Sequence, residues 1–272
     1  MPGNKVAVIM SVYMKDVLKN VSLAVNSILE QTYKNIDLYI MIDGEISNDV
    51  SCFLNSIKNK NVILYDNPTN RGLAYRLNQA IRAILKSDSY LYIARMDADD
   101  ISVRERIEVQ VKFLQENLNV DVVGSDVIEI NDEGEQIFYK KMCQTHNEII
   151  GNIIKKCPFN HPSVMFRIDV FNSGVLYNES LMNTQDYYLW IDLLALGFRF
   201  GNINKPLLFF RVDSKFHDRR GFSKAVNDLN SRIYAFKKIK SLTLFNVLHT
   251  VLLFSLRLSP PFIKKIAYKL FR

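Results

Sequence analysis

The chain has 272 residues, of which 48% are hydrophobic and 23% charged, and it carries a formal net charge of +7 at pH 7. This length and composition exclude a disordered chain and are typical of one large α/β domain, or of one domain with a smaller appendage. The three cysteines (Cys52, Cys143 and Cys157) lie far apart without metal-ligand spacing, and Lys5 precedes only a brief apolar stretch. We therefore expect a reduced, cytoplasmic protein without a secretory signal.

The positive charge is concentrated near the end of the chain. Residues 229–272 contain nine basic residues and no acidic residue. Because subtracting these nine charges from +7 leaves about −2 for residues 1–228, the main body is nearly neutral. A nucleic-acid partner is therefore not expected, and the basic segment needs another interpretation.

Strand and helix patterns alternate in the first hundred residues, as in repeated βαβ units. Four short apolar runs are predicted strands, and helices with one apolar face are predicted between them. The strands span 6–12, 36–42, 62–65 and 90–97, and the helices span 18–29, 50–57 and 73–84. Such repeats predict a parallel sheet whose ligands bind outside the carboxyl ends of its strands.

The pattern after residue 100 is more mixed. Ser102–Glu105 and Thr145–Glu148 both have the form of a capping box, which predicts that a helix starts at each of these positions. Asn131–Gly134 is typical of a hairpin turn, and Gly197 is expected to end a helix that begins at Asp186. The predicted strands in this half are 120–130, 136–142, 163–167 and 198–212.

The fourth predicted strand breaks abruptly into three carboxylates, Asp97, Asp99 and Asp100. Like charges this close repel each other, so a positive group is expected to compensate them. Mg²⁺ or Mn²⁺ fits, because these cations take oxygen ligands and often share them with substrate phosphates. An isolated acidic turn that caps the next helix is the alternative. Asp43 and Asn70–Gly72 follow the second and third strands, so all three clusters are predicted at one rim, which favours a metal-diphosphate site.

Five segments carry a combined signal: Val6–Tyr13, Ile42–Gly44, Asn70–Ala74, Asp97–Asp100 and Asn183–Trp190. In this order they resemble the family 2 glycosyltransferases, inverting enzymes with the nucleotide-sugar-binding GT-A fold. The resemblance implies an α/β fold with a Rossmann-like, mostly parallel central sheet flanked by helices. We expect a catalytic domain over residues 1–222, with the nucleotide-sugar-binding half over about 1–100 and the acceptor half over about 101–222.

By this resemblance, the strand ends contact the donor. Met14 stands where the family often has asparagine, and Asp43 is the one aspartate left of the family's Asp-Asp-Gly-Ser. Asp99 would bind the metal directly, Asp97 would contact the ribose or a metal-bound water, and Asp100 would either support the metal or help to start the next helix. The donor-binding residues that the resemblance implies are Ser11, Tyr13, Asp43, Asn70, Arg71, Gly72, Asp97, Ala98 and Asp99.

The resemblance also implies a catalytic base. Gln185–Trp190 is similar to the family's Glu-Asp-x-x-Leu-Trp segment, with glutamine in place of the glutamate, so Asp186 inherits the base role. The implied reaction moves a hexose, glucose or galactose, from a UDP-sugar to a hydroxyl group by direct displacement and forms a β-linkage. The cation would stabilise the leaving diphosphate, and Asp186 would take the proton of the attacking hydroxyl.

Four further residues are weaker candidates for contacts with the acceptor or the diphosphate. His161 resembles a family position near the acceptor, although a lone histidine is more often structural. Trp190 either packs in the core or lines the acceptor site. Arg219 and Arg220 either clamp the diphosphate or belong to a solvated loop.

Residues 223–272 are predicted to form a helical, membrane-associating segment. Leu242–Leu258 is apolar but too short and too interrupted to span a bilayer, and Phe262–Arg272 is a basic amphipathic stretch. We expect the segment to bind an anionic membrane surface on the inner face of the cell membrane, where many bacterial relatives extend a saccharide on undecaprenyl diphosphate. The alternative is a helix pair that packs on the catalytic domain.

Two other functions are kept as alternatives. Asp97-x-Asp99-x-Ile101 loosely resembles a phosphatase pattern in which Asp97 would be the nucleophile, although that family places this residue on its first strand. A non-catalytic assembly subunit would explain the acidic residues missing from two family motifs. The intact Asp97, Asp99 and Asp186 favour an enzyme.

Overall fold

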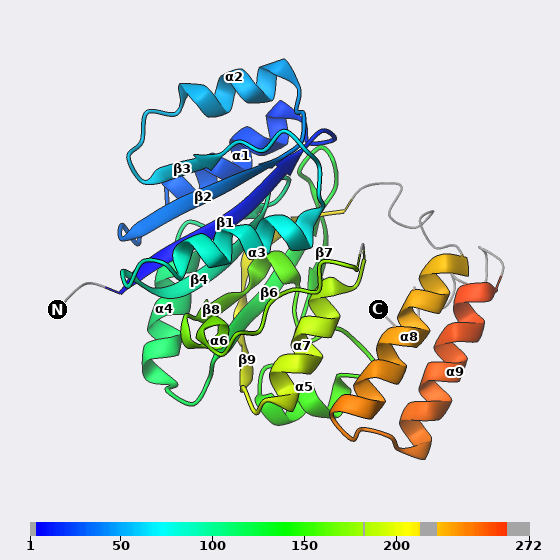
Figure 1. Cartoon of the computed structure of the whole chain (residues 1–272). Helices are drawn as coiled ribbons and strands as arrows, with labels where there is room; N and C mark the ends of the chain where they lie inside the picture. Colours follow the sequence, from blue (N-terminus) through cyan, green and yellow to red (C-terminus); the bar gives the residue numbers. More distant parts are fainter. Residues whose placement is uncertain (1–3, 182, 213–221, 260–272) are drawn as a thin grey trace.

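The computed structural model describes residues 4–181, 183–212 and 222–259. They form a nine-stranded sheet with helices on both faces, and two further helices stand at one side (Figure 1). The strand order is β3-β2-β1-β4-β8-β6-β9-β5, and β7 pairs with β6 beside this path. The α/β fold with a mostly parallel sheet that the sequence predicts is confirmed.

The first half of the sheet is parallel. Its strands are β1 (Lys5–Tyr13), β2 (Ile36–Asp43), β3 (Val62–Tyr65) and β4 (Tyr90–Asp97). Alternate side chains of β1, such as Val8 and Ile9, point into different core layers. Helices α1 (Leu18–Leu29) and α2 (Asn48–Ser56) cover one face, and α3 (Leu73–Ile84) covers the other. Because both faces are buried, the strands read as continuous apolar runs in the sequence.

The second half of the sheet is mixed. β8 (Met165–Arg167) lies antiparallel between β4 and β6 (Val122–Ile130), and β6 pairs in parallel with β9 (Phe200–Arg211). The antiparallel strands β7 (Gln136–Lys140) and β5 (Ile101–Ser102) pair with β6 and β9, respectively. The helical elements of this half are α4 (Arg106–Glu116), α5 (His146–Asn152), α6 (Asp169–Asn172), α7 (Gln185–Ala195) and a 3-10 turn at His161–Ser163.

Several local sequence signals in this half are confirmed. Gly134 in the hairpin has a φ of +92°, and Gly197 after α7 has a φ of +89°. Glycine adopts such angles without the steric strain that a Cβ atom would cause. Thr145 and Glu148 form the predicted capping box at the start of α5.

The capping box predicted at Ser102 is wrong. Ser102 belongs to β5, and α4 begins at Arg106 without a side-chain cap. The reason is that residues distant in the sequence contact Ser102 and Glu105 in the fold. The Ser102 N–H donates to Ser27 Oγ at 3.0 Å. Glu105, which the capping box would need, instead accepts from Lys205 Nζ at 2.8 Å.

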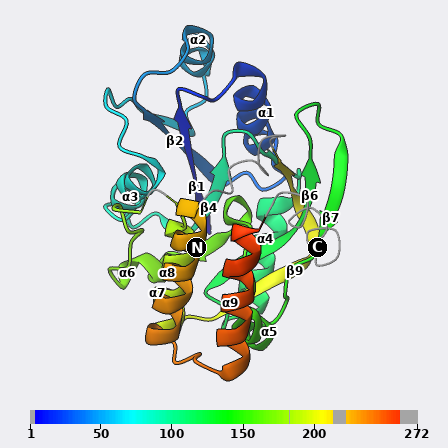
Figure 2. The ribbon, with the colours of Figure 1, turned by 90° about the vertical axis from the view of Figure 1, so that its right-hand side faces the viewer.

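Two helices, α8 (Phe222–Lys238) and α9 (Leu244–Leu258), lie beside α7 (Figures 1 and 2). α8 packs on α7, where the ring centroids of Tyr188 and Tyr234 are 4.6 Å apart. α9 contacts α8 and leaves much of its own apolar surface exposed. Within the described residues, no helix has the length and apolarity required to cross a bilayer. The basic stretch 262–272 lies outside the described residues, and the domain boundary at residue 222 stays a prediction.

Candidate active site

The carboxyl ends of β1, β2 and β4 meet at one rim of the sheet. In the parallel register, Tyr13 of β1 lies opposite Asp43 of β2, and Ser11 of β1 lies opposite Asp97 of β4. The structure therefore brings together the strand ends that the sequence places at one site. Ligands of parallel sheets bind at this kind of rim.

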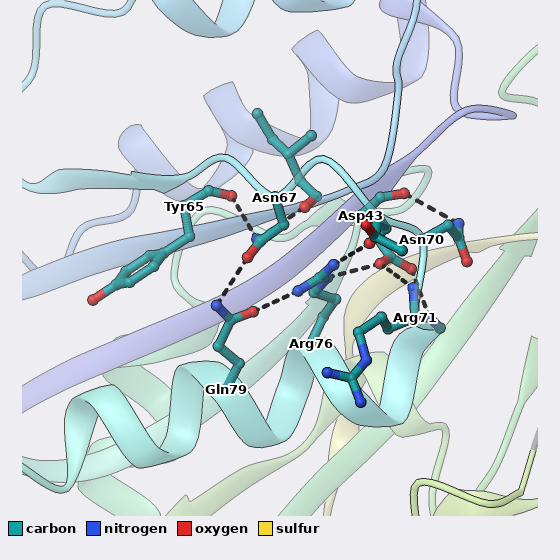
Figure 3. A network of polar contacts seen from close by, with 10 residues as sticks. Asp43, Tyr65, Asn67, Asn70, Arg71, Arg76 and Gln79 are labelled. Carbon is teal, nitrogen blue, oxygen red and sulfur yellow. Dashed lines mark hydrogen bonds and ion pairs between the residues drawn. The ribbon is translucent and has the colours of Figure 1, made fainter.

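A buried ion pair organises the turn that enters α3 (Figure 3). Asp43, only 3% exposed, accepts a hydrogen bond from Arg76 Nε at 2.7 Å. Its carboxylate also accepts from the backbone N–H groups of Arg71 at 2.8 Å and Gly72 at 2.9 Å, while Asn70 Nδ2 donates to the Asp43 carbonyl at 3.1 Å. Asp43 thus holds the Asn70–Gly72 turn in place, whereas its contact with a nucleotide stays a prediction.

Arg71 is the exposed member of this group. Its guanidinium lies over the ring of Tyr75, 3.6 Å from the ring centroid. This stacking orients a planar cation at the rim without neutralising it. The side chain is therefore available to an anionic or aromatic group of a ligand.

The aspartate cluster follows β4. Asp97, Asp99 and Asp100 each offer a carboxylate oxygen, and these oxygens lie within 4.8 Å of one another. Asp100 is buried, and its Oδ2 has no hydrogen-bond partner although its Oδ1 accepts from the Arg211 N–H at 2.8 Å. An orphaned buried oxygen beside two other carboxylates fits a divalent cation. This arrangement favours a metal-supporting role for Asp100. The alternative, a role in starting a helix at Ser102, is not favoured because Ser102 belongs to β5.

Buried arginines compensate much of the charge of this cluster. Arg95, fully buried, donates to Asp97, and Arg211 Nε donates to the Asp99 carbonyl at 2.9 Å. Burial and the charge of Asp97 nevertheless raise the pKa of Asp99 to about 6. For the same reasons the pKa of Asp100 lies well above its ordinary value. The arginines therefore do not fully compensate the carboxylates, and a further positive charge would favour the ionised cluster.

A fourth carboxylate, Asp16, lies close to the cluster and was missed by the sequence analysis. It follows β1 by three residues, and its Oδ2 accepts from the Tyr13 N–H at 2.8 Å. Burial raises the pKa of Asp16 to about 7, and the charges of Asp99 and Asp97 contribute to this shift. The one indication in the sequence is that Asp16 lies shortly after the predicted strand 6–12.

The predicted base, Asp186, lies in the first turn of α7. Burial raises its pKa, and the charge of Asp97 adds to this shift, so the base and the aspartate cluster are electrostatic neighbours. The Cys157 thiol donates to Asp186 Oδ2 at 4.0 Å. Burial and the charge of Asp186 raise the pKa of this thiol to about 12, which keeps it protonated. Cys157 is thus a neutral neighbour of Asp186 and not a nucleophile.

The residues just before Asp186 carry local strain and an unsatisfied polar group. Thr184 has a φ of +65°, which is unusual for a β-branched residue. Gln185 Oε1 is buried and has no hydrogen-bond partner. Both features are typical of functional sites, where backbone strain and orphaned polar atoms are concentrated.

The weaker candidates divide into three cases. His161 Nε2 is 2.8 Å from the Tyr177 hydroxyl, and burial lowers the pKa of this imidazole well below its ordinary value, so it is neutral. Trp190 is 0% exposed and packs against Phe159, so it lies in the core, which is one of the two alternatives that the sequence leaves open. Arg219 and Arg220 lie outside the described residues.

Comparison with known proteins agrees with this geometry. Residues 7–171 match the family described as Glycosyl transferase family 2. The O-antigen biosynthesis glycosyltransferase WbnJ of Escherichia coli is 32% identical over 220 residues, which cover 77% of this chain and 80% of the relative. An Escherichia coli protein named UDP-Gal:alpha-D-GlcNAc-diphosphoundecaprenol beta-1,3-galactosyltransferase is 28% identical, and the match covers 86% of this chain and 84% of the relative.

Solved structures share the fold. TarS 1-349 from S. aureus, in complex with UDP-GlcNAc, aligns with a TM-score of 0.62 at 14% identity over 92% of this chain and 79% of its own. The mannosyltransferase PcManGT from Pyrobaculum calidifontis, in complex with GDP-Man and Mn²⁺, aligns with a TM-score of 0.56 at 14% identity over 96% of this chain and 83% of its own. The fold is therefore the GT-A fold that these glycosyltransferase structures share. The chain belongs to glycosyltransferase family 2.

We expect Arg76→Met to lower the free energy of unfolding by about 3–5 kcal/mol, because it leaves the buried Asp43 carboxylate without its cation. Arg82→Met is the matched control on the same helix, because it removes an exposed ion pair with Glu179 and should cost less than about 1 kcal/mol. Urea unfolding of both variants checks the difference. Equal losses would contradict the organising role of the Asp43–Arg76 pair.

The raised pKa of Asp16 predicts a pH-dependent stability in the absence of divalent cations. Between the ordinary value of 3.8 and about 7, the carboxyl group ionises in the unfolded chain but keeps its proton in the folded one. The free energy of unfolding should therefore fall as the pH rises through this window.

Asp16→Asn should make that fall shallower, because asparagine keeps an acceptor for the Tyr13 N–H and does not ionise. Asp88→Asn, at an exposed position, is the control and should keep the wild-type slope. Urea unfolding at several pH values measures the slopes. A wild-type slope in Asp16→Asn would refute the assignment.

Proposed function

We propose that the protein is an inverting glycosyltransferase that moves a hexose from a UDP-sugar to a hydroxyl of a lipid-linked saccharide and forms a β-glycosidic bond. The observation that carries the proposal is that Asp186 lies near enough to the aspartate cluster after β4 for the charge of Asp97 to act on its carboxyl group. One relative is named as a galactosyltransferase with UDP-Gal as the donor and a diphosphoundecaprenol-linked acceptor, and this name supports the choice of donor and acceptor. Glucose and galactose are the hexoses that we propose.

The aspartate cluster is the proposed site for Mn²⁺ or Mg²⁺. Asp99 would bind the cation directly, and Asp97 and the orphaned oxygen of Asp100 would support it. Bound there, the cation would stabilise the negative charge that develops on the leaving nucleoside diphosphate. Arg71, stacked on Tyr75, would contact the donor from the neighbouring turn.

Asp186 is the proposed general base. An acceptor hydroxyl is too weakly acidic to attack the anomeric carbon unaided, so its proton must pass to a nearby group during the attack. Burial raises the pKa of Asp186 and so strengthens it as a base. Because Gln185 replaces the second acidic residue of the motif, Asp186 would act alone. Direct displacement would invert the anomeric centre.

The rival functions have less support. A phosphatase would need Asp97 as a free nucleophile, but Asp97 accepts a hydrogen bond from the buried Arg95 guanidinium. A non-catalytic subunit would not need a buried orphaned oxygen at Asp100 or a strained Thr184 beside Asp186. The family match also favours transfer over either alternative.

Peripheral attachment to the cytoplasmic face of the membrane is part of the proposal. α9 exposes a row of leucines that includes Leu244, Leu248 and Leu252, with exposed fractions of 87%, 54% and 60%. In the sequence, the segment 229–272, to which α9 belongs, carries nine basic residues and no acidic one. An apolar helix face with adjacent positive charge is suited to the interface of an anionic bilayer.

Asp186→Asn should lower kcat by a factor of about 10² to 10⁴, because it removes the base but keeps the shape of the side chain. UDP binding, measured by calorimetry with Mn²⁺, should stay unchanged in this variant. Asp99→Ala should instead weaken Mn²⁺-dependent UDP binding, and the exposed Asp88→Asn is the control for both measurements. Near-normal transfer by Asp186→Asn would remove this residue as the base.

Replacement of Leu248 and Leu252 by glutamate should reduce binding to vesicles that contain anionic lipid by at least about tenfold, because each buried leucine contributes about 1.5–3 kcal/mol. The control replaces Leu118 and Leu196, which are 80% and 60% exposed but lie elsewhere on the surface. Vesicle flotation measures both double variants. Unchanged flotation of the α9 variant would show that this face does not touch the membrane.

A further inference from the structure

Lys140, at the end of β7, is a half-buried cation that has no anionic partner among the described residues. Its Nζ donates to Asn160 Oδ1 at 2.7 Å. Within the described part of the chain, no carboxylate oxygen lies within 4.0 Å of Lys140 Nζ. The buried Arg95, by contrast, donates to Asp97. A partly desolvated ammonium that lacks a counter-ion is suited to an anion supplied by a ligand.

Lys140 borders the proposed base. Its partner Asn160 belongs to the same short segment as Cys157, whose sulfur is 4.0 Å from Asp186 Oδ2. The charges of Lys140 and Asp186 both act on the Cys157 thiol, which places all three groups in one neighbourhood. An anion on Lys140 would therefore lie on the acceptor side of the active site.

A second lysine extends this positive region. Lys156 is exposed, and its charge acts on Lys140. Burial lowers the pKa of the Lys140 ammonium, Cys157 opposes this change and Lys156 reinforces it. An anion between the two lysines would favour their charged forms, so its binding would relieve an unfavourable arrangement.

The same segment leads to the exposed face of α9. Lys155, next to Lys156 in the chain, holds its Nζ 4.9 Å from the ring centroid of Phe245 on α9. Phe245 is itself 63% exposed. The lysines thus lie between the apolar surface of α9 and Asp186. This order matches that of a lipid-linked saccharide, in which a charged diphosphate joins the lipid tail to the sugar.

We propose that Lys140, together with Lys156, binds the diphosphate of the lipid-linked acceptor and thereby places the acceptor sugar beside Asp186. The inference rests on the proposed function, because it takes Asp186 to be the base. It assigns a binding site to the one strongly charged group that every lipid-diphosphate acceptor shares. The proposed site recognises the diphosphate linker, so it does not depend on which sugar the linker carries.

The test measures binding of decyl diphosphate to the full-length protein by calorimetry, with saturating UDP and Mn²⁺ present to occupy the donor site. Lys140→Met keeps the apolar part of the side chain and should weaken binding at least about tenfold, as for the loss of one charge-assisted hydrogen bond. Lys140→Arg keeps the charge and should restore most of the affinity. Lys112→Met, an exposed lysine on α4, is the control for net charge and should bind as the wild type does.

Titration of UDP alone distinguishes the acceptor diphosphate from that of the donor. UDP affinity should be unchanged in Lys140→Met, and an equal loss for UDP and decyl diphosphate would assign this lysine to the donor and overturn the proposal. Unchanged decyl diphosphate binding would overturn it as well. If Lys140→Met does not fold, Lys156→Gln, at an exposed position, decides: weaker decyl diphosphate binding supports the site and wild-type binding refutes it.

The proposed function is tested separately by transfer assays. Absence of transfer from any UDP-sugar, together with Lys140-dependent decyl diphosphate binding, would contradict glycosyl transfer and leave the diphosphate site standing. Glycosyl transfer without Lys140-dependent decyl diphosphate binding would support the proposed function and contradict the diphosphate site.

Discussion

Compensation of carboxylate charge at the carboxyl end of β4 is the constraint on which the active-site half of the structure depends. Two unit charges 4 Å apart at a partly buried site interact by about 4 kcal/mol, and three carboxylate oxygens here lie within 4.8 Å of one another. Arg95 from β4 itself and Arg211 from the end of β9 bring positive charge to them. The acidic cluster can therefore exist only where these elements meet.

This charge balance also ties distant segments together. Arg211 Nη1 donates to the carbonyl of Asn131 at 2.6 Å and to that of Asp132 at 3.1 Å, so one side chain joins the loop of the aspartate cluster to the β6–β7 hairpin. Arg106 of α4 donates to the Arg95 carbonyl at 2.7 Å and fixes the backbone beneath Asp97. The arginines around the aspartate cluster thus also help to hold the sheet together. The Asp43–Arg76 pair does the same for the neighbouring turn.

The sequence predicted the parts of the fold and site whose causes are local. Buried parallel strands are short apolar runs, and a polar cluster after each run marks the rim, so Asp43 and Asp97 could be located without a structure. The structure around Ser102 could not be predicted from the sequence. Its capping-box pattern competes with contacts from residues that lie more than seventy positions away. Arg95 and Arg211 were missed because a cation within a strand shows no periodic signal, and only the fold shows which acid it meets.

The two sides of the active site differ in how far general rules determine them. The proposed donor side is built from β1, β2 and β4, where the parallel register forces the strand ends together whatever sugar is bound. The proposed acceptor side combines Asp186 on α7, the Cys157–His161 segment and the helices α8 and α9, which meet through packing and not through register. Because packing contacts vary with individual side chains more freely than strand register does, differences in acceptor choice among relatives should arise on this side. Lys140, which has no counter-ion within the part of the chain that the structure describes, is one such side chain, and the proposed diphosphate linker would supply the missing charge.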